Sequence, residues 1–303
     1  MLHLDLATRT SVIGTLYAAT DVDGGQTKAQ LDLLDALARH VMRVPPSAAA
    51  VISPSESAAA IEKPRLRRAV GEILVTLELV RHPPSAALTA RVAEYLAALE
   101  IEDGFQRLAA DYLANDRERV YRDWERVRQP DLVEPFVEGL GDTVLTKKME
   151  SLGDLPAGSL GRGLFDFYRR NGFPWIPDDD QDTLIPHDLT HVLAGYWTTP
   201  EGEVALQGFL VGAARGESHF SSLLASLLLF EVGMLPFPNI ELVTAVLSRP
   251  DAADLFASAI ERGLECDGDI AGDHQALLPR PLAEVRAELG IPEPEPGPHM
   301  FIL

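Results

Sequence analysis

Apolar residues recur at intervals of three and four along nearly the whole chain of 303 residues. This period places apolar side chains on one face of an α-helix. The alternation typical of a half-buried strand does not stand out, and no tight hairpin dipeptide separates two apolar runs. Breaks that contain proline at 44–47, 82–85 and 128–131 divide the first 130 residues into a handful of helices. The sequence therefore predicts an all-α protein.

Charge is distributed unevenly between the two parts of the chain. Residues 1–130 contain 16 Lys and Arg against 18 Asp and Glu, whereas residues 131–303 contain 10 against 28. We therefore expect two helical domains, 1–130 and 131–303, with the charged segment 103–128 as one helix leading to the boundary. The acidic second part would repel a phosphate backbone, so no nucleic-acid partner is expected.

The single cysteine, Cys266, excludes an intrachain disulfide and a cysteine-based zinc cluster. An acid at Asp5 and the lack of a basic start argue against a secretory signal. The most apolar stretch, 223–237, is interrupted by Glu231 and is too short to cross a bilayer. We expect a cytoplasmic protein, with peripheral contact to a membrane surface left open.

Two histidines four residues apart, His187 and His191, follow a predicted helix start. Asp182 and Thr183 are capping residue types, and Pro186 suits a first helical turn. The spacing of four places both imidazoles on one face of the helix, about one turn apart. Helices present two nitrogens to one divalent ion at this spacing.

Two carboxylates extend this pair into a candidate metal site. Asp188 is either a third ligand or a residue that orients an imidazole, and Glu203 falls in the first turn of the next predicted helix. Histidine and carboxylate ligands without cysteine suit Zn²⁺, Fe²⁺ or Mn²⁺. We expect a divalent metal, with zinc as the first choice and iron or manganese as alternatives.

The motif departs from two families of metal-dependent hydrolases. Zincin metalloproteases need a glutamate after the first histidine, where this chain has Asp188. HD-type phosphohydrolases need a further upstream histidine, and the nearest one, His82, falls in the other predicted domain. A metallohydrolase of unknown substrate stays open, but it would require a base near the metal that the motif itself does not supply.

The pattern His187-Asp188-x-x-His191-x(11)-Glu203 resembles the signature of the coenzyme Q biosynthesis protein four (Coq-four) family. Its flanks agree as well, because glycines follow the histidines and precede the glutamate, and the run GSLGRGLFDFYRRNGFPWIPDD lies upstream. The resemblance covers about 140–250. It implies that the four named residues are metal ligands in a helical fold with an apolar ligand cavity beside the metal.

The same resemblance implies a role in maturation of the quinone head group, by oxidative removal of the ring carboxylate, and in organising biosynthetic enzymes at a membrane surface. An isoprenoid tail would need an apolar cavity. Residues expected to line it are Leu223, Leu227, Phe230 and Met234. Plain core packing is the alternative interpretation of these four residues.

Residues 11–41 are similar to the start of the tellurite-resistance protein B (TerB-like) family, in which a helix ends in an acidic Asp-Gly turn and a second helix begins. The match is carried by Asp21, Asp23, Gly24 and Gly25. The resemblance implies an interaction or regulatory module. A calcium-binding EF-hand fits less well, because its sixth loop position requires glycine and this chain has Gln26.

Two functional hypotheses follow. The first is a metal-dependent protein that acts on, or holds, an aromatic and prenylated quinone precursor, as an oxidative decarboxylase or lyase. The alternative is a non-catalytic scaffold that binds lipid or quinone, with a structural metal and a TerB-like interaction module. An open coordination position favours the enzyme, and a closed site with four protein ligands favours the scaffold. Expected partners are a hydrophobic small molecule, an enzyme complex or membrane surface, and a second copy of the chain.

Overall fold

The computed structural model describes residues 4–101, 150–172, 184–213, 218–234, 243–270, 272 and 274–302. Across these ranges every regular element is a helix, and two isolated β-bridges are the only strand-like pairings. The all-α expectation is confirmed. The helix expected over 103–128 and the boundary near 130 lie outside the described residues, so the division into two domains stays a prediction.

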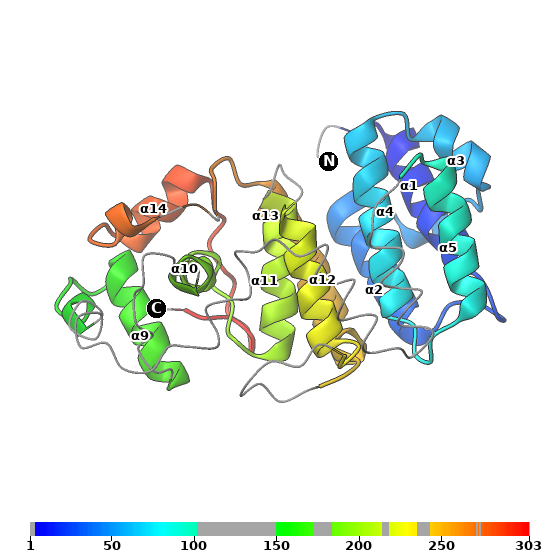
Figure 1. Ribbon diagram of the computed structural model, residues 1–303. Helices are drawn as coiled ribbons and strands as arrows, with labels where there is room; N and C mark the ends of the chain where they lie inside the picture. The colour runs from blue at the N-terminus through cyan, green and yellow to red at the C-terminus, as the bar shows by residue number, and fades with distance from the viewer. Residues whose placement is uncertain are drawn as a thin grey trace.

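Residues 4–101 contribute a helical bundle, drawn in blue to cyan in Figure 1. Its elements are α1 (Leu6–Thr20), α2 (Lys28–Ala36), the π-helical η1 (Leu37–Met42), the 3-10 turn η2 (Pro46–Ala48), α3 (Pro54–Ala60), α4 (Pro64–Leu79) and α5 (Ala86–Ala98). The break expected at 82–85 falls between α4 and α5, and the one expected at 44–47 lies between η1 and α3, where it runs into the 3-10 turn η2. Local capping chemistry begins α2, where Thr27 and Gln30 bond reciprocally through side chain and backbone.

An acidic turn at 21–25 joins α1 to α2. Asp23, Gly24 and Gly25 have φ angles of 53°, 89° and 121°. Glycine adopts this left-handed backbone at little cost, so the two glycines fit the turn. Asp23 also accepts a hydrogen bond from the Ser85 hydroxyl, which ties the turn to the start of α5. The chain thus forms a helix, an acidic turn and a second helix between Leu6 and Ala36.

The second part of the chain contributes further helices. They are α9 (Leu160–Asn171), α10 (Leu184–Ala194), α11 (Pro200–Ala213), α12 (Ser218–Phe230), the 3-10 turn η5 (Val246–Ser248), α13 (Ala252–Leu264), the 3-10 turn η6 (Gln275–Leu277) and α14 (Leu282–Leu289). In Figure 1, α11, α12 and α13 stand beside the N-terminal bundle, and α9, α10 and α14 lie on their far side. A glycine permits close packing of α11 on α13, because a Cβ on Gly263 would lie 2.0 Å from the carbonyl oxygen of Phe209.

Buried apolar residues of the described helices form two clusters. The first fills the N-terminal bundle and continues into α12 and one face of α13. The second contains residues of α9, α10, α14 and the C-terminal segment. It also contains most of the apolar residues of α11. The helix that carries both histidines of the motif therefore belongs to the second cluster, on the side away from the N-terminal bundle.

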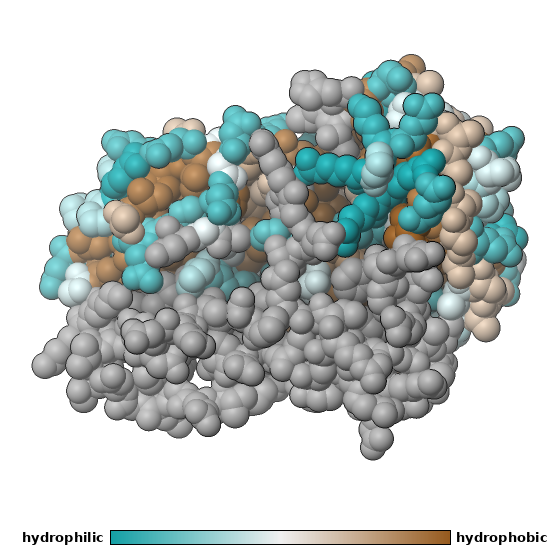
Figure 2. Space-filling model, turned by 45° about the horizontal axis from the view of Figure 1, so that its top comes forward, coloured by the Kyte–Doolittle hydropathy of each residue, from teal (hydrophilic) through white to brown (hydrophobic). Residues whose placement is uncertain are grey.

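The surface of the described region is mixed. Hydrophilic residues are interspersed with apolar patches on the face shown in Figure 2. None of the described helices is both long and apolar enough to span a membrane.

Candidate metal centre

The connection between α10 and α11 brings the two halves of the motif together. Helix α10 ends at Ala194, and Gly195 takes a left-handed φ of 80°. The chain then reverses, and the Thr199 hydroxyl accepts the N–H of Gly202 at 3.1 Å to begin α11. Glu203 consequently lies in the first turn of α11, facing α10. The expected capping residues Asp182 and Thr183 lie outside the described residues.

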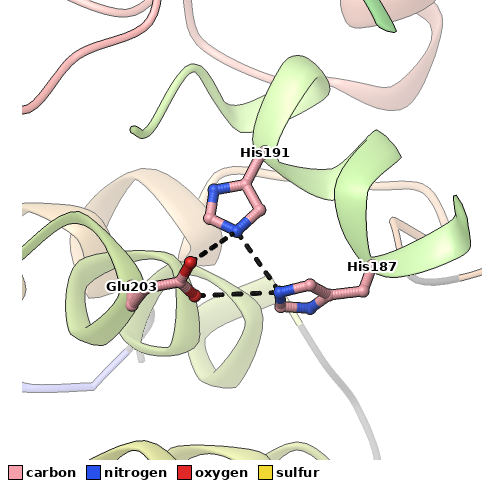
Figure 3. Close-up of side chains that lie close together, drawn as sticks. All are labelled: His187, His191 and Glu203. Atoms are coloured by element: carbon pink, nitrogen blue, oxygen red, sulfur yellow. Dashed lines mark hydrogen bonds and ion pairs between the residues drawn. The ribbon is translucent and has the colours of Figure 1, made fainter. Parts of the chain in front are cut away.

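His187, His191 and Glu203 point toward one another (Figure 3). One ligand atom from each lies within 4.8 Å of the other two. The Nε2 atom of His191 is 3.3 Å from Nε2 of His187 and 3.3 Å from Oε1 of Glu203, and His187 Nε2 is 3.7 Å from Glu203 Oε2. This arrangement can hold a metal ion.

The distances between the ligand atoms of these three residues are close to those found around a tetrahedral zinc ion. Two ligand atoms that lie 2.0–2.1 Å from a tetrahedral zinc ion are separated by about 3.3 Å, whereas two at right angles around the same ion would be about 2.9 Å apart. Two of the three observed separations are 3.3 Å and the third is 3.7 Å. The two distances to Glu203 run to different carboxylate oxygens, Oε1 for His191 and Oε2 for His187, so the three side chains converge at spacings close to those around one ion.

His191 has a fixed tautomer as well as a fixed position. Its side chain is fully buried, and its Nδ1 atom lies 3.0 Å from the carbonyl oxygen of Tyr196. A carbonyl can only accept a hydrogen bond, so the neutral imidazole carries its hydrogen on Nδ1 and its lone pair on Nε2. The ring of Phe167 stacks on the imidazole with centroids 5.4 Å apart. The lone pair therefore points at His187 and Glu203.

Contacts within the cluster shift the pKa values of Glu203 and His187. Burial disfavours the ionised Glu203 carboxylate, but the charges and hydrogen bonds of His191 and His187 hold its pKa below the usual range. For His187, burial acts against the charged imidazolium, yet the hydrogen bond and charge of Glu203 raise its pKa. Without a metal, the proton of the His187 imidazolium thus stabilises the contact with the Glu203 carboxylate. A bound metal cation would replace this proton.

Asp188, the remaining predicted ligand, lies beside this cluster and outside the converging set. It is buried, and its Oδ2 atom accepts a hydrogen bond from the Tyr168 hydroxyl of α9. Burial raises the pKa of Asp188, against the opposing charge of His187 and the Tyr168 hydrogen bond. Its role as a ligand stays a prediction. Tyr168 was not among the predicted site residues, although it lies in the upstream run that resembles the Coq-four family.

The four predicted cavity residues are buried in the first apolar cluster, together with the N-terminal helices. They are Leu223, Leu227, Phe230 and Met234. Leu223 lines an apolar cavity of about 40 Å³ between α1, η1, α4, α11, α12 and α13. Phe167, which stacks on His191, and Leu189, which lies within the motif, belong to the second cluster. The assignment of an isoprenoid tail to these four residues stays a prediction.

No known family model and no curated protein sequence matches the chain. Among solved structures, a candidate ubiquinone biosynthesis protein from Nostoc punctiforme PCC 73102 is similar at 19% sequence identity and a TM-score of 0.35. The match covers 73% of this chain and 96% of that chain. A similarity at this level does not establish a family.

Proposed function

We propose that the protein binds one divalent metal ion, zinc in the first instance, through His187, His191 and Glu203. The observation that carries the proposal is the spacing of their donor atoms, with separations of 3.3, 3.3 and 3.7 Å. A hydrogen-bonded cluster without a metal does not require that all three donors converge at this spacing. The buried hydrogen bond from His191 to the Tyr196 carbonyl is the outer support that metal-binding histidines usually have.

We further propose that the metal serves chemistry on an aromatic, prenylated quinone precursor. Support comes from the spacing of the motif and its glycine flanks, which resemble the Coq-four signature. When bound, the metal supplies a Lewis acid for a phenolic or carboxylate oxygen. Oxidative removal of a ring carboxylate also releases carbon dioxide and requires an external oxidant.

The residues around the ion would supply negative charge, orient the His191 ring and move a proton. Glu203 contributes a negative charge, and the Tyr196 carbonyl keeps the His191 ring from turning. Asp188 is a buried carboxyl group whose raised pKa suits it to hold or release a proton, with the Tyr168 hydroxyl fixing its orientation. Asp188 is therefore our candidate for moving a proton at this site.

A non-catalytic scaffold is the second candidate function. The position of Asp188 favours it, because a rotation that broke its bond to Tyr168 would add a fourth protein ligand and close the site. In that case the metal would be structural, and the protein would hold a lipid or quinone without changing it.

Elemental analysis of the purified protein tests the metal proposal. We expect about one zinc ion per chain, and loss of that ion in His191→Ala, while His40→Ala serves as a matched control on a histidine far along the chain in η1. Full occupancy in His191→Ala would refute the site. Extraction of the same preparation with organic solvent should release an apolar aromatic compound, and a preparation with metal but no such compound would count against quinone chemistry.

Cobalt substitution separates the enzyme from the scaffold. Addition of azide or a phenolate to the Co²⁺ protein should change its visible absorption spectrum if one coordination position is open. An unchanged spectrum would favour the closed site with Asp188 as the fourth ligand.

A further inference from the structure

The segment Gly297–Ile302, which we term the C-terminal strap, pairs with the backbone between α10 and α11. The N–H of Trp197 donates to the carbonyl of His299 at 2.9 Å, and the N–H of Phe301 donates to the carbonyl of Gly195 at 2.8 Å. These two bonds flank an antiparallel bridge between Tyr196 and Met300. Figure 1 shows this part of the chain, in red, running between α10 and α11.

Aromatic contacts connect the strap to His191. Phe301 is fully buried, with its ring edge-on to Phe167 at 5.4 Å and to Trp197 at 4.8 Å between centroids. Phe167 is the same ring that stacks on the His191 imidazole. Arg170 holds the strap from α9, with its guanidinium 5.4 Å from the Phe301 ring centroid.

A second contact connects the strap to the helix of Glu203. His299 Nδ1 lies 3.0 Å from the hydroxyl oxygen of Thr199. The same hydroxyl caps the first turn of α11, and the Thr199 carbonyl accepts the N–H of Glu203 at 2.8 Å. The strap therefore contacts the supports of both arms of the metal centre, although none of its residues is a ligand.

We propose that the C-terminal strap is a positioning element for the metal centre, with Phe301 as its anchor, so that docking of the strap sets metal affinity and metal binding strengthens docking. The connecting atom is the Tyr196 carbonyl oxygen, which orients His191 and lies on the residue bridged to Met300. Because affinity coupling is reciprocal, each event must favour the other by the same factor. This inference rests on the metal site of the proposed function.

Metal affinity measured by competition with a chelator tests the inference on the full-length chain. Phe301→Ala should weaken Zn²⁺ binding by about 10-fold to 100-fold, the usual effect of removing an outer support of a metal ligand. Phe301→Leu, which keeps an apolar anchor, should recover much of this loss. Ile302→Ala is the matched control, since its side chain is 42% exposed, and should change the affinity by less than about twofold.

Amide hydrogen exchange on the unmodified protein provides a test that needs no variant. Added Zn²⁺ should slow exchange at Trp197 and Phe301, and His191→Ala should abolish this effect. Phe301→Ala that binds Zn²⁺ with unchanged affinity, or exchange in the strap that is the same with and without metal, would overturn the inference while leaving the metal site intact. Failure of the unmodified protein to bind Zn²⁺ would overturn the metal site, and the inference with it.

Discussion

The imidazole Nδ1 of His191 lies 3.0 Å from the backbone carbonyl oxygen of Tyr196, five residues along the chain. This one contact links the end of α10 to the orientation of a side chain of the proposed metal site, because it directs the lone pair of Nε2 toward His187 and Glu203. The backbone that carries the carbonyl is in turn paired with the C-terminal strap. The orientation of the His191 ring thus depends on the end of α10 and on a segment about 100 residues later in the chain, which pairs with Tyr196.

Replacing Glu203 tests whether the carboxylate is a ligand or only a counter-charge. Glu203→Gln keeps the size of the side chain but removes its negative charge and replaces one of the two carboxylate oxygens that could bind the metal. We expect the metal affinity to fall at least about 10-fold, measured by chelator competition at pH 7.5. Glu284→Gln at the exposed start of α14 is the control, since this carboxylate lies outside the cluster. Equal affinities for the two variants would contradict ligation by Glu203.

As the pH is lowered, metal binding should begin to weaken at a higher pH than for a site with an ordinary histidine, whose pKa is 6.5. A histidine ligand must be neutral, and Glu203 raises the pKa of His187 above its usual value of 6.5, although burial opposes this. Protons therefore begin to compete with the metal above pH 6.5, and affinity is lost as pH falls through the raised pKa. Titration of Zn²⁺ between pH 5.5 and 8.5 measures this, with NMR of the metal-free His187 imidazole as the independent value. An affinity that stays constant from pH 8 to 6 would argue against His187 as a ligand.

The sequence predicted the local part of this site and missed the distant part. A spacing of four residues on a helix brings His187 and His191 together whatever the rest of the fold does. Glu203 was predicted to join them from its place in the first turn of the next helix and from the resemblance to a family signature. No spacing rule places Tyr168 against Asp188, or Phe301 against Phe167, because these contacts depend on how separate elements pack.

The fold shows the same limit. Apolar periodicity predicted the helices, yet it could not show that the run 31–42 changes from α-helix to π-helix at Leu37. It also predicted that Leu223 and Leu227 would be buried in some apolar environment, and both are. Which neighbours bury them is a tertiary property, and in the structure they join the cluster of the N-terminal helices.

Tyr168→Phe should lower the stability of the protein, because Asp188 loses the hydrogen bond that the Tyr168 hydroxyl donates. The change keeps the aromatic ring packed but removes the hydroxyl that donates to the buried carboxylate. Loss of one partner of a buried hydrogen bond costs about 1–3 kcal/mol, so the free energy of unfolding should fall by about 2 kcal/mol. The pKa of Asp188, already raised by burial, should rise further. Urea unfolding and NMR titration measure the two effects, and Tyr17→Phe in α1 is the control for loss of a phenol bonded to a different carboxylate, Asp35.

A buried carboxyl group far along the chain from the metal centre should make stability depend on pH. Burial raises the pKa of Glu78 in α4 from 4.5 to about 7, although the Thr89 hydroxyl donates a hydrogen bond to it. A folded-state pKa above the unfolded value gives stability that is complete below pH 4.5 and is lost as pH rises through 7. The shift of about 2.5 pKa units corresponds to about 3 kcal/mol. The protein should therefore be less stable to urea at pH 8 than at pH 5 as far as this residue is concerned.

Glu78→Gln removes this dependence, since the amide cannot ionise and its oxygen can still accept from Thr89. At pH 8 the variant should gain up to about 3 kcal/mol in the free energy of unfolding, and at pH 4.5 it should match the unmodified protein within about 0.5 kcal/mol. Glu94→Gln on the exposed face of α5 is the control and should show no such pH-dependent gain. A gain of the same size at both pH values would mean that packing, and not ionisation, accounts for the effect at Glu78.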